Sequence, residues 1–292
     1  MNAETTALDL IEFSNKIHDI VPPQSHVETI ASGFQKTEGP VWISESQSLF
    51  FTDFPAFKIY KWHPENGLSV FKEQSNRAVG LALDTEERLI ACESVTRSIT
   101  RTEKNNETTT LASHYNGKRL NSPNDVVVKS NGSIYFTDPR SRFLTDTQEL
   151  DFNGVFKVDP ANGNVHLLTP EFQWPNGLCF SPDESLLYVN DSSRQHIKVF
   201  DVLKDGTLKN SRTFAELDTA FGKGAPDGMK VDTQGNLYVT GPGGVWILNP
   251  TGDPLGIIKI PEGVLNIGFA GSTLYLTAQT TVRRIELTIP GI

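Results

Sequence analysis

The sequence contains little cysteine and no excess of basic residues. Cys92 and Cys179 are the two cysteines among 292 residues, and each lies in an apolar run, as is typical of a small buried side chain. We therefore expect two free thiols and no disulfide. The formal net charge of −9 and the pI near 5.2 leave no basic stripe for nucleic acid or an anionic membrane. This composition favours a small ligand that is uncharged or bridged by a metal ion.

Long hydrophobic runs are also missing. No stretch approaches the roughly 18 apolar residues of a membrane-spanning helix. The first residues, MNAETTALDLIEFSNKIHDI, lack the basic and apolar regions of a secretory signal. We therefore expect a cytoplasmic protein that binds neither membrane nor nucleic acid. The sequence carries no signal for an oligomeric state.

Two common catalytic patterns are absent. No serine lies in a G-x-S-x-G motif, which disfavours a Ser-His-Asp hydrolase. The six histidines show no metal-ligand spacing, and His114, in the loop before Asn124, is more typical of a surface histidine. The glycine-rich segment 241–244 is not followed by a helical pattern, so it indicates a hairpin turn and not a phosphate loop.

Short strand patterns fill the chain beyond residue 25. Runs such as SLFFTD, SIYFTD, LLYVND and TLYLTA are rich in β-branched and aromatic residues and are bounded by Gly, Pro, Asn and Asp. A helical period is almost confined to residues 4–19, where Leu8, Ile11 and Ile17 recur on one face. The sequence therefore predicts an all-β domain over residues 26–292. Residues 1–25 are predicted as an N-terminal extension, with a short helix packed outside the domain.

A sixfold repeat identifies the type of all-β fold. Each unit has a turn followed by a first strand, and a second strand ends 12 to 15 residues later. The residues that begin the first strands are Glu38, Val79, Asn124, Asn176, Asp227 and Asn266. The second strands end on Asp53, Glu93, Asp138, Asp191, Gly241 and Ala278. A period of roughly 40 to 50 residues is typical of propeller blades, so we predict a six-bladed β-propeller. Residues 27–30 are predicted to add a strand to the last blade and close the ring.

The first-strand residues are predicted to form a ring around the central channel. Innermost strands line that channel, so equivalent positions from all blades converge at one mouth. The set contains two carboxylates, three amides and one valine. Carboxylates that converge repel one another unless a positive charge lies between them, which favours a metal ion. Asn and Asp are also ordinary turn residues, and at any one position a turn residue is more common than a metal ligand. Four oxygen donors at equivalent positions favour the metal.

The donor types indicate which metal. Carboxylate and amide oxygens without His or Cys favour Ca²⁺, and two carboxylates match its charge. Zn²⁺, Mn²⁺ or Mg²⁺ remain possible ions at such a site. Among the second-strand acids, Asp138 and the adjacent Arg140 are candidate substrate contacts, because that strand end returns to the same mouth. The alternative for Asp138 is a structural acid that accepts hydrogen bonds from a turn.

Several long motifs resemble the SMP-30/gluconolactonase/LRE-like family, in its bacterial gluconolactonase branch. They are TEGPVW, RLNSPNDVVVKSNGSIYFTDP, WPNGLCFSPDESLLYVND and APDGMKVDTQGNLYVTGPGGVWILNP, and the similarity runs from about residue 26 to the C-terminus. The resemblance implies a six-bladed propeller with one divalent ion in its channel. It also implies that Glu38, Asn124, Asn176 and Asp227 bind this metal.

The resemblance and the ring together suggest a metal-dependent lactonase. A divalent ion polarises the carbonyl of a sugar lactone such as glucono-1,5-lactone, which is hydrolysed to the aldonic acid. Asp227 is the candidate to position or deprotonate the attacking water, and Asn124 is both a ligand and a candidate substrate contact. Two alternatives stay open: an esterase or phosphotriesterase with another substrate, and a non-catalytic propeller that calcium stabilises.

Overall fold

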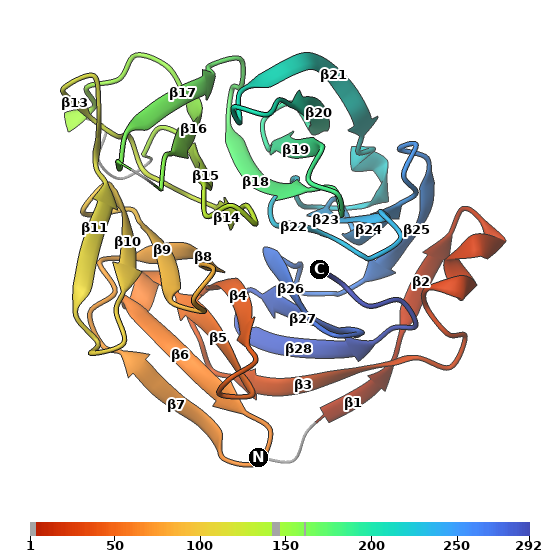
Figure 1. Ribbon diagram of the computed structural model, residues 1–292. Coiled ribbons are helices and arrows are strands. Elements are labelled where there is room, and N and C mark those ends of the chain that lie inside the picture. The colour runs from red at the N-terminus through yellow and green to blue at the C-terminus, as the bar shows by residue number, and fades with distance from the viewer. Residues whose placement is uncertain (1–3, 142–146, 161) are drawn as a thin grey trace.

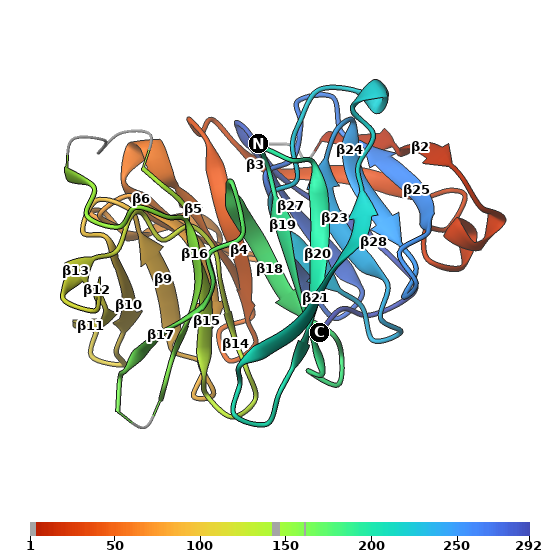
Figure 2. The same ribbon diagram turned by 90° about the horizontal axis from the view of Figure 1, so that it is seen from above.

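The computed structural model describes residues 4–141, 147–160 and 162–292. Within them, six antiparallel sheets of four or five strands are arranged as blades around a central axis, together with one two-stranded ribbon (Figures 1 and 2). The six-bladed β-propeller is therefore confirmed. The ribbon joins β12 (His114–Tyr115) to β13 (Lys118–Arg119), in the loop between blades 2 and 3.

Each blade runs from an inner strand to an outer one. Blades 1 to 3 contain β4 (Thr37–Ile43), β5 (Ser48–Asp53), β6 (Lys58–His63) and β7 (Gly67–Lys72); β8 (Ala78–Leu83), β9 (Leu89–Glu93), β10 (Ser98–Thr102) and β11 (Thr108–Ala112); and β14 (Val126–Val128), β15 (Ile134–Asp138), β16 (Gly154–Val158) and β17 (Val165–Thr169). Blades 4 to 6 contain β18 (Pro175–Phe180), β19 (Leu186–Asp191), β20 (His196–Val202) and β21 (Leu208–Glu216); β22 (Met229–Val231), β23 (Leu237–Gly241), β24 (Gly244–Leu248) and β25 (Pro254–Lys259); and β26 (Asn266–Ala270), β27 (Thr273–Ala278), β28 (Thr281–Glu286) and β3 (His26–Ser32).

The hydrophobic core lies between neighbouring blades. Tyr135 of blade 3 packs in one cluster with Leu178 of blade 4, and Cys179 of blade 4 packs with Met229 of blade 5. Both faces of the second strands are therefore covered, and β5, β15 and β23 are buried along their whole length. This explains why these strands read as continuous apolar runs in the sequence. Both cysteines are buried and free, as expected.

The circle of blades is closed in blade 6, where a strand from the N-terminal part of the chain pairs with a strand from the C-terminal part. β3 pairs antiparallel with β28, with Val27 opposite Ile285 and Ala31 opposite Val282. The predicted contribution of residues 27–30 to the last blade is therefore confirmed. This pairing covers an edge of blade 6 that would otherwise expose backbone groups.

The predicted N-terminal helix is wrong. Of residues 4–19, β1 (Glu4–Ala7) pairs with β3 at the outer edge of blade 6, and β2 (Asp9–Glu12) pairs with β25 at the outer edge of blade 5. Only Asn15–Asp19 are helical, as the short 3₁₀ turn η1. The free edges of β3 and β25 offer backbone partners that outweigh a weak helical period. Among residues 4–141, 147–160 and 162–292 no helix is long and apolar enough to cross a membrane.

Candidate active site

A cavity of about 850 Å³ contains all four predicted metal ligands. Glu38, Asn124, Asn176 and Asp227, which we call the ring, come from blades 1, 3, 4 and 5 and lie where the inner strands begin. Glu38 and Asn176 are buried, whereas Asn124 and Asp227 are partly exposed to the cavity. The structure therefore brings together four side chains that are spread over 190 positions of the sequence.

The glycine that follows several ring residues permits close packing of blades. A Cβ atom on Gly177 would collide with the carbonyl oxygen of Asp227 in the next blade. Gly39, at φ 51°, similarly faces the carbonyl oxygen of Val79. Any side chain at these positions would push two inner strands apart. The E-G and N-G pairs in the sequence therefore combine a candidate ligand with a residue that lets the neighbouring blade approach.

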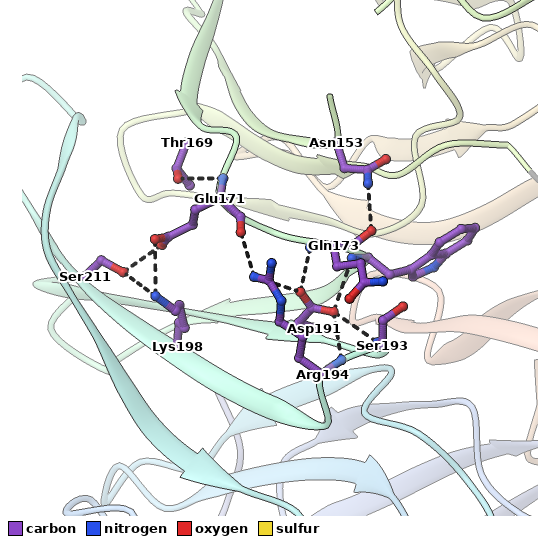
Figure 3. A network of polar contacts seen from close by, with 10 residues as sticks. Asn153, Thr169, Glu171, Gln173, Asp191, Ser193, Arg194, Lys198 and Ser211 are labelled. Atoms are coloured by element: carbon purple, nitrogen blue, oxygen red, sulfur yellow. Dashed lines mark hydrogen bonds and ion pairs between the residues drawn. The ribbon is translucent and has the colours of Figure 1, made fainter. Parts of the chain in front are cut away.

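Acids at the ends of second strands hold the loops that lead into the ring. In blades 1, 3 and 4 a buried aspartate accepts hydrogen bonds from the backbone N–H groups two and three residues before the ring residue. The sets are Asp53 with Gln35 and Lys36, Asp138 with Asn121 and Ser122, and Asp191 with Gln173 and Trp174. Asp191 also accepts from the backbone of Ser193 and Arg194 (Figure 3). These four bonds join two loops of blade 4 at one carboxylate.

The residue before each of these acids connects one blade to the next. The Thr137 hydroxyl donates to the carbonyl oxygen of Asn176 at 2.7 Å, and the Thr52 hydroxyl donates to that of Val79 at 3.0 Å. In blade 4 the side-chain amide of Asn190 donates to the carbonyl oxygen of Asp227. The acceptor in each case is the first-strand residue of the following blade. The pairs Thr137-Asp138 and Asn190-Asp191 therefore each hold the loop before one ring residue and the backbone of the next ring residue.

Glu38 is held by two hydrogen bonds, in surroundings that disfavour its negative charge. Its Oε2 accepts from the backbone N–H of Gly39 at 2.9 Å and from the side-chain amide of Asn266 at 3.0 Å. Burial raises the pKa of Glu38 to about 7, and the negative charge of Asp125 adds to the shift. Asn266, the first-strand residue of blade 6, therefore holds the candidate ligand Glu38 in place and does not line the cavity itself.

Asp227 lies in an even more unfavourable environment for a negative charge. Burial raises its pKa well above the usual range, and the charges of Glu38 and Asp125 raise it further. Asp125 is buried beside the ring, and its Oδ2 has no hydrogen-bond partner in the described part of the chain. Sequence comparison of the blades assigned Asn124 and left Asp125 without a role. The signal was present, since Asp125 is a second polar residue at the start of a buried strand.

The ring fits a hard divalent cation. The Oδ1 of Asn176 is buried and finds no partner within the described residues, while its amide nitrogen donates to Ser192 at 3.0 Å. An orphaned amide oxygen beside two mutually repelling carboxylates is what a cation would stabilise. No group of three or more His, Cys, Asp or Glu side chains in the described ranges could hold a metal. A metal at this site therefore depends on the amide oxygens of Asn124 and Asn176.

The two remaining predicted contacts separate in the structure. Asp138 is fully buried, does not line the cavity, and uses its two carboxylate oxygens to accept from Asn121 and Ser122 at 2.7 Å each. The structure therefore does not bring the Asp138 carboxylate to the cavity, and its two hydrogen bonds match the alternative expectation of a structural acid that accepts from a turn. Arg140 is exposed at the cavity rim, where its guanidinium donates to the carbonyl oxygen of Asp151.

Sequence reasoning missed much of the cavity wall. The aromatic rings of Phe54, Trp174 and Phe221 line it, together with the cationic side chains of Lys36 and Arg77. Lys36 and Trp174 lie two residues before Glu38 and Asn176, in the loops held by the second-strand acids. The sequence shows that both residues lie two positions before a ring residue. It does not show whether these loops turn their side chains towards the channel.

Comparison with known proteins gives a consistent picture. The model of the SMP-30/Gluconolactonase/LRE-like region matches residues 36–280. A gluconolactonase from Zymomonas mobilis is 34% identical over 316 aligned positions, covering 98% of this chain and 88% of that protein. The solved structure of a gluconolactonase from Xanthomonas campestris has a TM-score of 0.88 at 28% identity, covering 97% of this chain and 95% of that one. The calcium-binding protein regucalcin from Agrobacterium tumefaciens, at 17% identity and a TM-score of 0.75, covers 90% of this chain and 93% of its own and shares the fold.

Proposed function

The chain belongs to the SMP-30/gluconolactonase/LRE-like family, and from this premise we propose that it is a lactonase that hydrolyses a sugar lactone to the aldonic acid. The observation that carries the proposal is the convergence of Glu38, Asn124, Asn176 and Asp227 in one cavity of about 850 Å³. That volume is within the usual range for a small-molecule site. The gluconolactonase relatives support the substrate class.

We infer that the ring holds one divalent metal ion, with Ca²⁺ favoured by its oxygen-only donors. When bound, such an ion supplies Lewis-acid polarisation of the lactone carbonyl. Glu38 and Asp227 would contribute charge, and Asn124 and Asn176 would contribute amide oxygens. The orphaned Oδ1 of Asn176 supports this assignment.

The side chains of the ring also have roles that do not depend on the ion. Asp227 is partly exposed to the cavity and is the candidate general base. Its carboxylate takes a proton from a water molecule as the water oxygen adds to the carbonyl carbon. The C–O bond of the lactone ring then breaks, and Asp227 gives the proton to the leaving oxygen, which becomes a hydroxyl group. Asn124, which also faces the cavity, would orient the lactone through its amide.

The cavity wall around the four ring residues carries apolar and polar groups that can contact a sugar. Phe54, Trp174 and Phe221 offer apolar faces, and the side chain of Asn124 offers polar groups in the same cavity. The same aromatic residues favour a second candidate, an aryl ester. Aromatic walls contact the apolar face of either ligand, so the substrate must be tested directly.

The test is hydrolysis of glucono-1,5-lactone by chelated protein, followed by addition of calcium, zinc, manganese or magnesium, with spontaneous hydrolysis subtracted. We expect activity to return with metal. Parallel assays with an aryl acetate and with an aryl phosphotriester examine the alternatives. Turnover of neither lactone nor ester under any ion would refute the enzyme proposal and favour a binding propeller.

A further inference from the structure

The hydroxyl group of Ser192 connects two of the ring residues. Ser192 follows β19 in blade 4, is partly buried and lines the cavity. Its Oγ donates to the carbonyl oxygen of Pro226, the buried residue that precedes Asp227 in blade 5. The same oxygen accepts from the side-chain amide of Asn176 at 3.0 Å. One hydroxyl group therefore contacts the side chain of one ring residue and the backbone beside another.

The hydroxyl proton decides which end of the Asn176 amide faces Ser192. A serine hydroxyl has one proton, and a carbonyl oxygen can only accept a hydrogen bond. Since that proton goes to Pro226, the Ser192 oxygen offers only lone pairs to Asn176. The amide nitrogen must therefore face Ser192, and the amide oxygen points away from it. The reverse orientation would place two acceptors against each other with no proton between them.

This orientation leaves the amide oxygen of Asn176 as a free acceptor. The Asn176 side chain is buried, and its Oδ1 has no hydrogen-bond partner within the described ranges. Burial raises the pKa of Asp227, and a hydrogen bond from the Asn176 side chain opposes that shift. The nitrogen end of the amide is therefore engaged by the protein, and the oxygen end is left for a ligand.

We propose that Ser192 is a positioning residue that holds the Asn176 amide with its oxygen free to bind the divalent ion. The inference rests on the metal-dependent lactonase proposed above and adds a residue to its site. Groups that hydrogen-bond to a metal ligand fix its orientation, and their loss typically costs about 10- to 100-fold in metal affinity. Ser192 is not a ligand in this arrangement, because Pro226 and Asn176 engage its hydroxyl group.

The readout is calcium affinity, because it can be measured without turnover. Chelator-treated and dialysed protein is titrated with calcium in an isothermal titration calorimeter. Ser192→Ala should raise the calcium Kd by about tenfold, and Ser192→Thr, which keeps the hydroxyl group, should stay within about twofold of wild type. An unchanged Kd in Ser192→Ala would overturn the inference. A rise in Ser192→Thr as large as in Ser192→Ala would also overturn it, since the hydroxyl group would then not matter.

Ser94 provides a matched control at the equivalent position of blade 2. It follows β9 and lines the cavity, and its backbone N–H donates to the carbonyl oxygen of Arg77 at 3.3 Å, as that of Ser192 donates to Trp174 at 3.0 Å. Its hydroxyl group donates to the same Arg77 carbonyl at 3.0 Å, and the first-strand residue of this blade is Val79. Ser94→Ala therefore loses a comparable hydrogen bond and should leave the calcium Kd unchanged. A rise as large as in Ser192→Ala would contradict the specific role of Ser192.

A double-mutant cycle separates the amide contact from the backbone contact. Asn176→Asp replaces the amide by a carboxylate whose two oxygens are equivalent, so the orientation of the group no longer matters. Ser192→Ala should therefore raise the calcium Kd by less in the Asn176→Asp background than in wild type. An equal rise in both backgrounds would mean that Ser192 acts through the carbonyl group of Pro226, and it would refute the orienting role.

The same titrations separate this inference from the proposed function. Calcium binding that depends on Ser192, in a protein that hydrolyses no lactone, supports the positioning role and refutes the lactonase. Metal-dependent hydrolysis with a calcium Kd that is independent of Ser192 supports the lactonase and refutes the positioning role. No calcium binding by wild type would refute the calcium site and this inference together.

Discussion

In blades 1, 3 and 4, Asp53, Asp138 and Asp191 end the second strands, whereas Glu38, Asn124 and Asn176 begin the first. Both sets are polar residues in buried strands, and in the sequence they are hard to tell apart. The second-strand acids accept backbone hydrogen bonds and take no part in the cavity wall. The ring residues lie in the cavity, and one of them keeps an oxygen with no partner in the described chain. Access to the cavity, and not polarity, therefore separates the candidate ligands from the structural acids, and Asn176 in addition keeps an unused acceptor.

The largest expected effect is on catalysis at Asp227. Asp227→Asn should lower kcat for lactone hydrolysis by about 10²- to 10⁴-fold, the usual contribution of a general base. Its melting temperature in chelator should change little, since the substitution removes a charge that burial disfavours. Steady-state kinetics and thermal melts on the same preparation check both halves. Near-normal turnover would remove Asp227 from the site.

The second-strand acids should show the opposite behaviour. Asp191→Ala leaves four backbone N–H groups without their acceptor and should lower the free energy of unfolding by about 3 kcal/mol. Urea unfolding in chelator measures it. Asp227→Asn under the same conditions is the comparison. Equal losses in the two variants would break the distinction between ring and second-strand acids.

Metal removal should lower the stability of the folded protein, and this loss should depend on the ring residues and not on the second-strand acids. A ligand present at 100 times its Kd stabilises the folded state by about 2.7 kcal/mol, so chelation should lower the melting temperature by several degrees. Glu38→Gln should reduce the shift caused by calcium, whereas Asp53→Asn should keep it. Melts with and without calcium give the difference. A calcium shift that survives in Glu38→Gln and Asp227→Asn would place the ion elsewhere.

Contacts between blades should have a smaller effect. Thr137→Val keeps the shape of the side chain but removes the hydroxyl that donates to Asn176 and accepts from the N–H of Asp125. We expect a loss of about 2 kcal/mol in the free energy of unfolding, because two buried backbone groups lose their partner. Urea unfolding checks this. Thr213→Val, in the outer strand β21, is a control for the same substitution at an exposed position.

The smallest effect is expected for an exposed acid outside both sets. Hydrogen bonds from Ser181 and Ser185 lower the pKa of Asp183 to about 2. Because the folded pKa lies below the unfolded one, the stabilisation is present above about pH 4 and is lost as the pH falls towards 2. Asp183→Asn should cost less than about 1 kcal/mol at pH 7 after solvent screening. Melts from pH 7 to pH 3 should show the two proteins converging; a constant difference would count against this account.

The repeat in the sequence predicted the six blades and the closing strand because each blade repeats the same buried pattern. The N-terminal segment was misread for a physical reason. Its apolar spacing permits a helix, but pairing with the free edges of β3 and β25 depends on strands about 22 and 247 positions further along the chain. Local periodicity contains no information about such edges.

The sequence by itself determined the propeller and the identity of the ring residues, since turn chemistry and strand order put equivalent positions at one mouth of the channel. Only the tertiary structure decided which polar residues line the cavity and which hold the backbone or a neighbouring side chain in place. Asp138 is occupied by two backbone N–H groups, Asn266 supports Glu38, and Lys36 and Arg77 share one aromatic ring. Hydrogen-bond capacity and local charge depend on which groups meet in space, and the groups that meet here come from different blades.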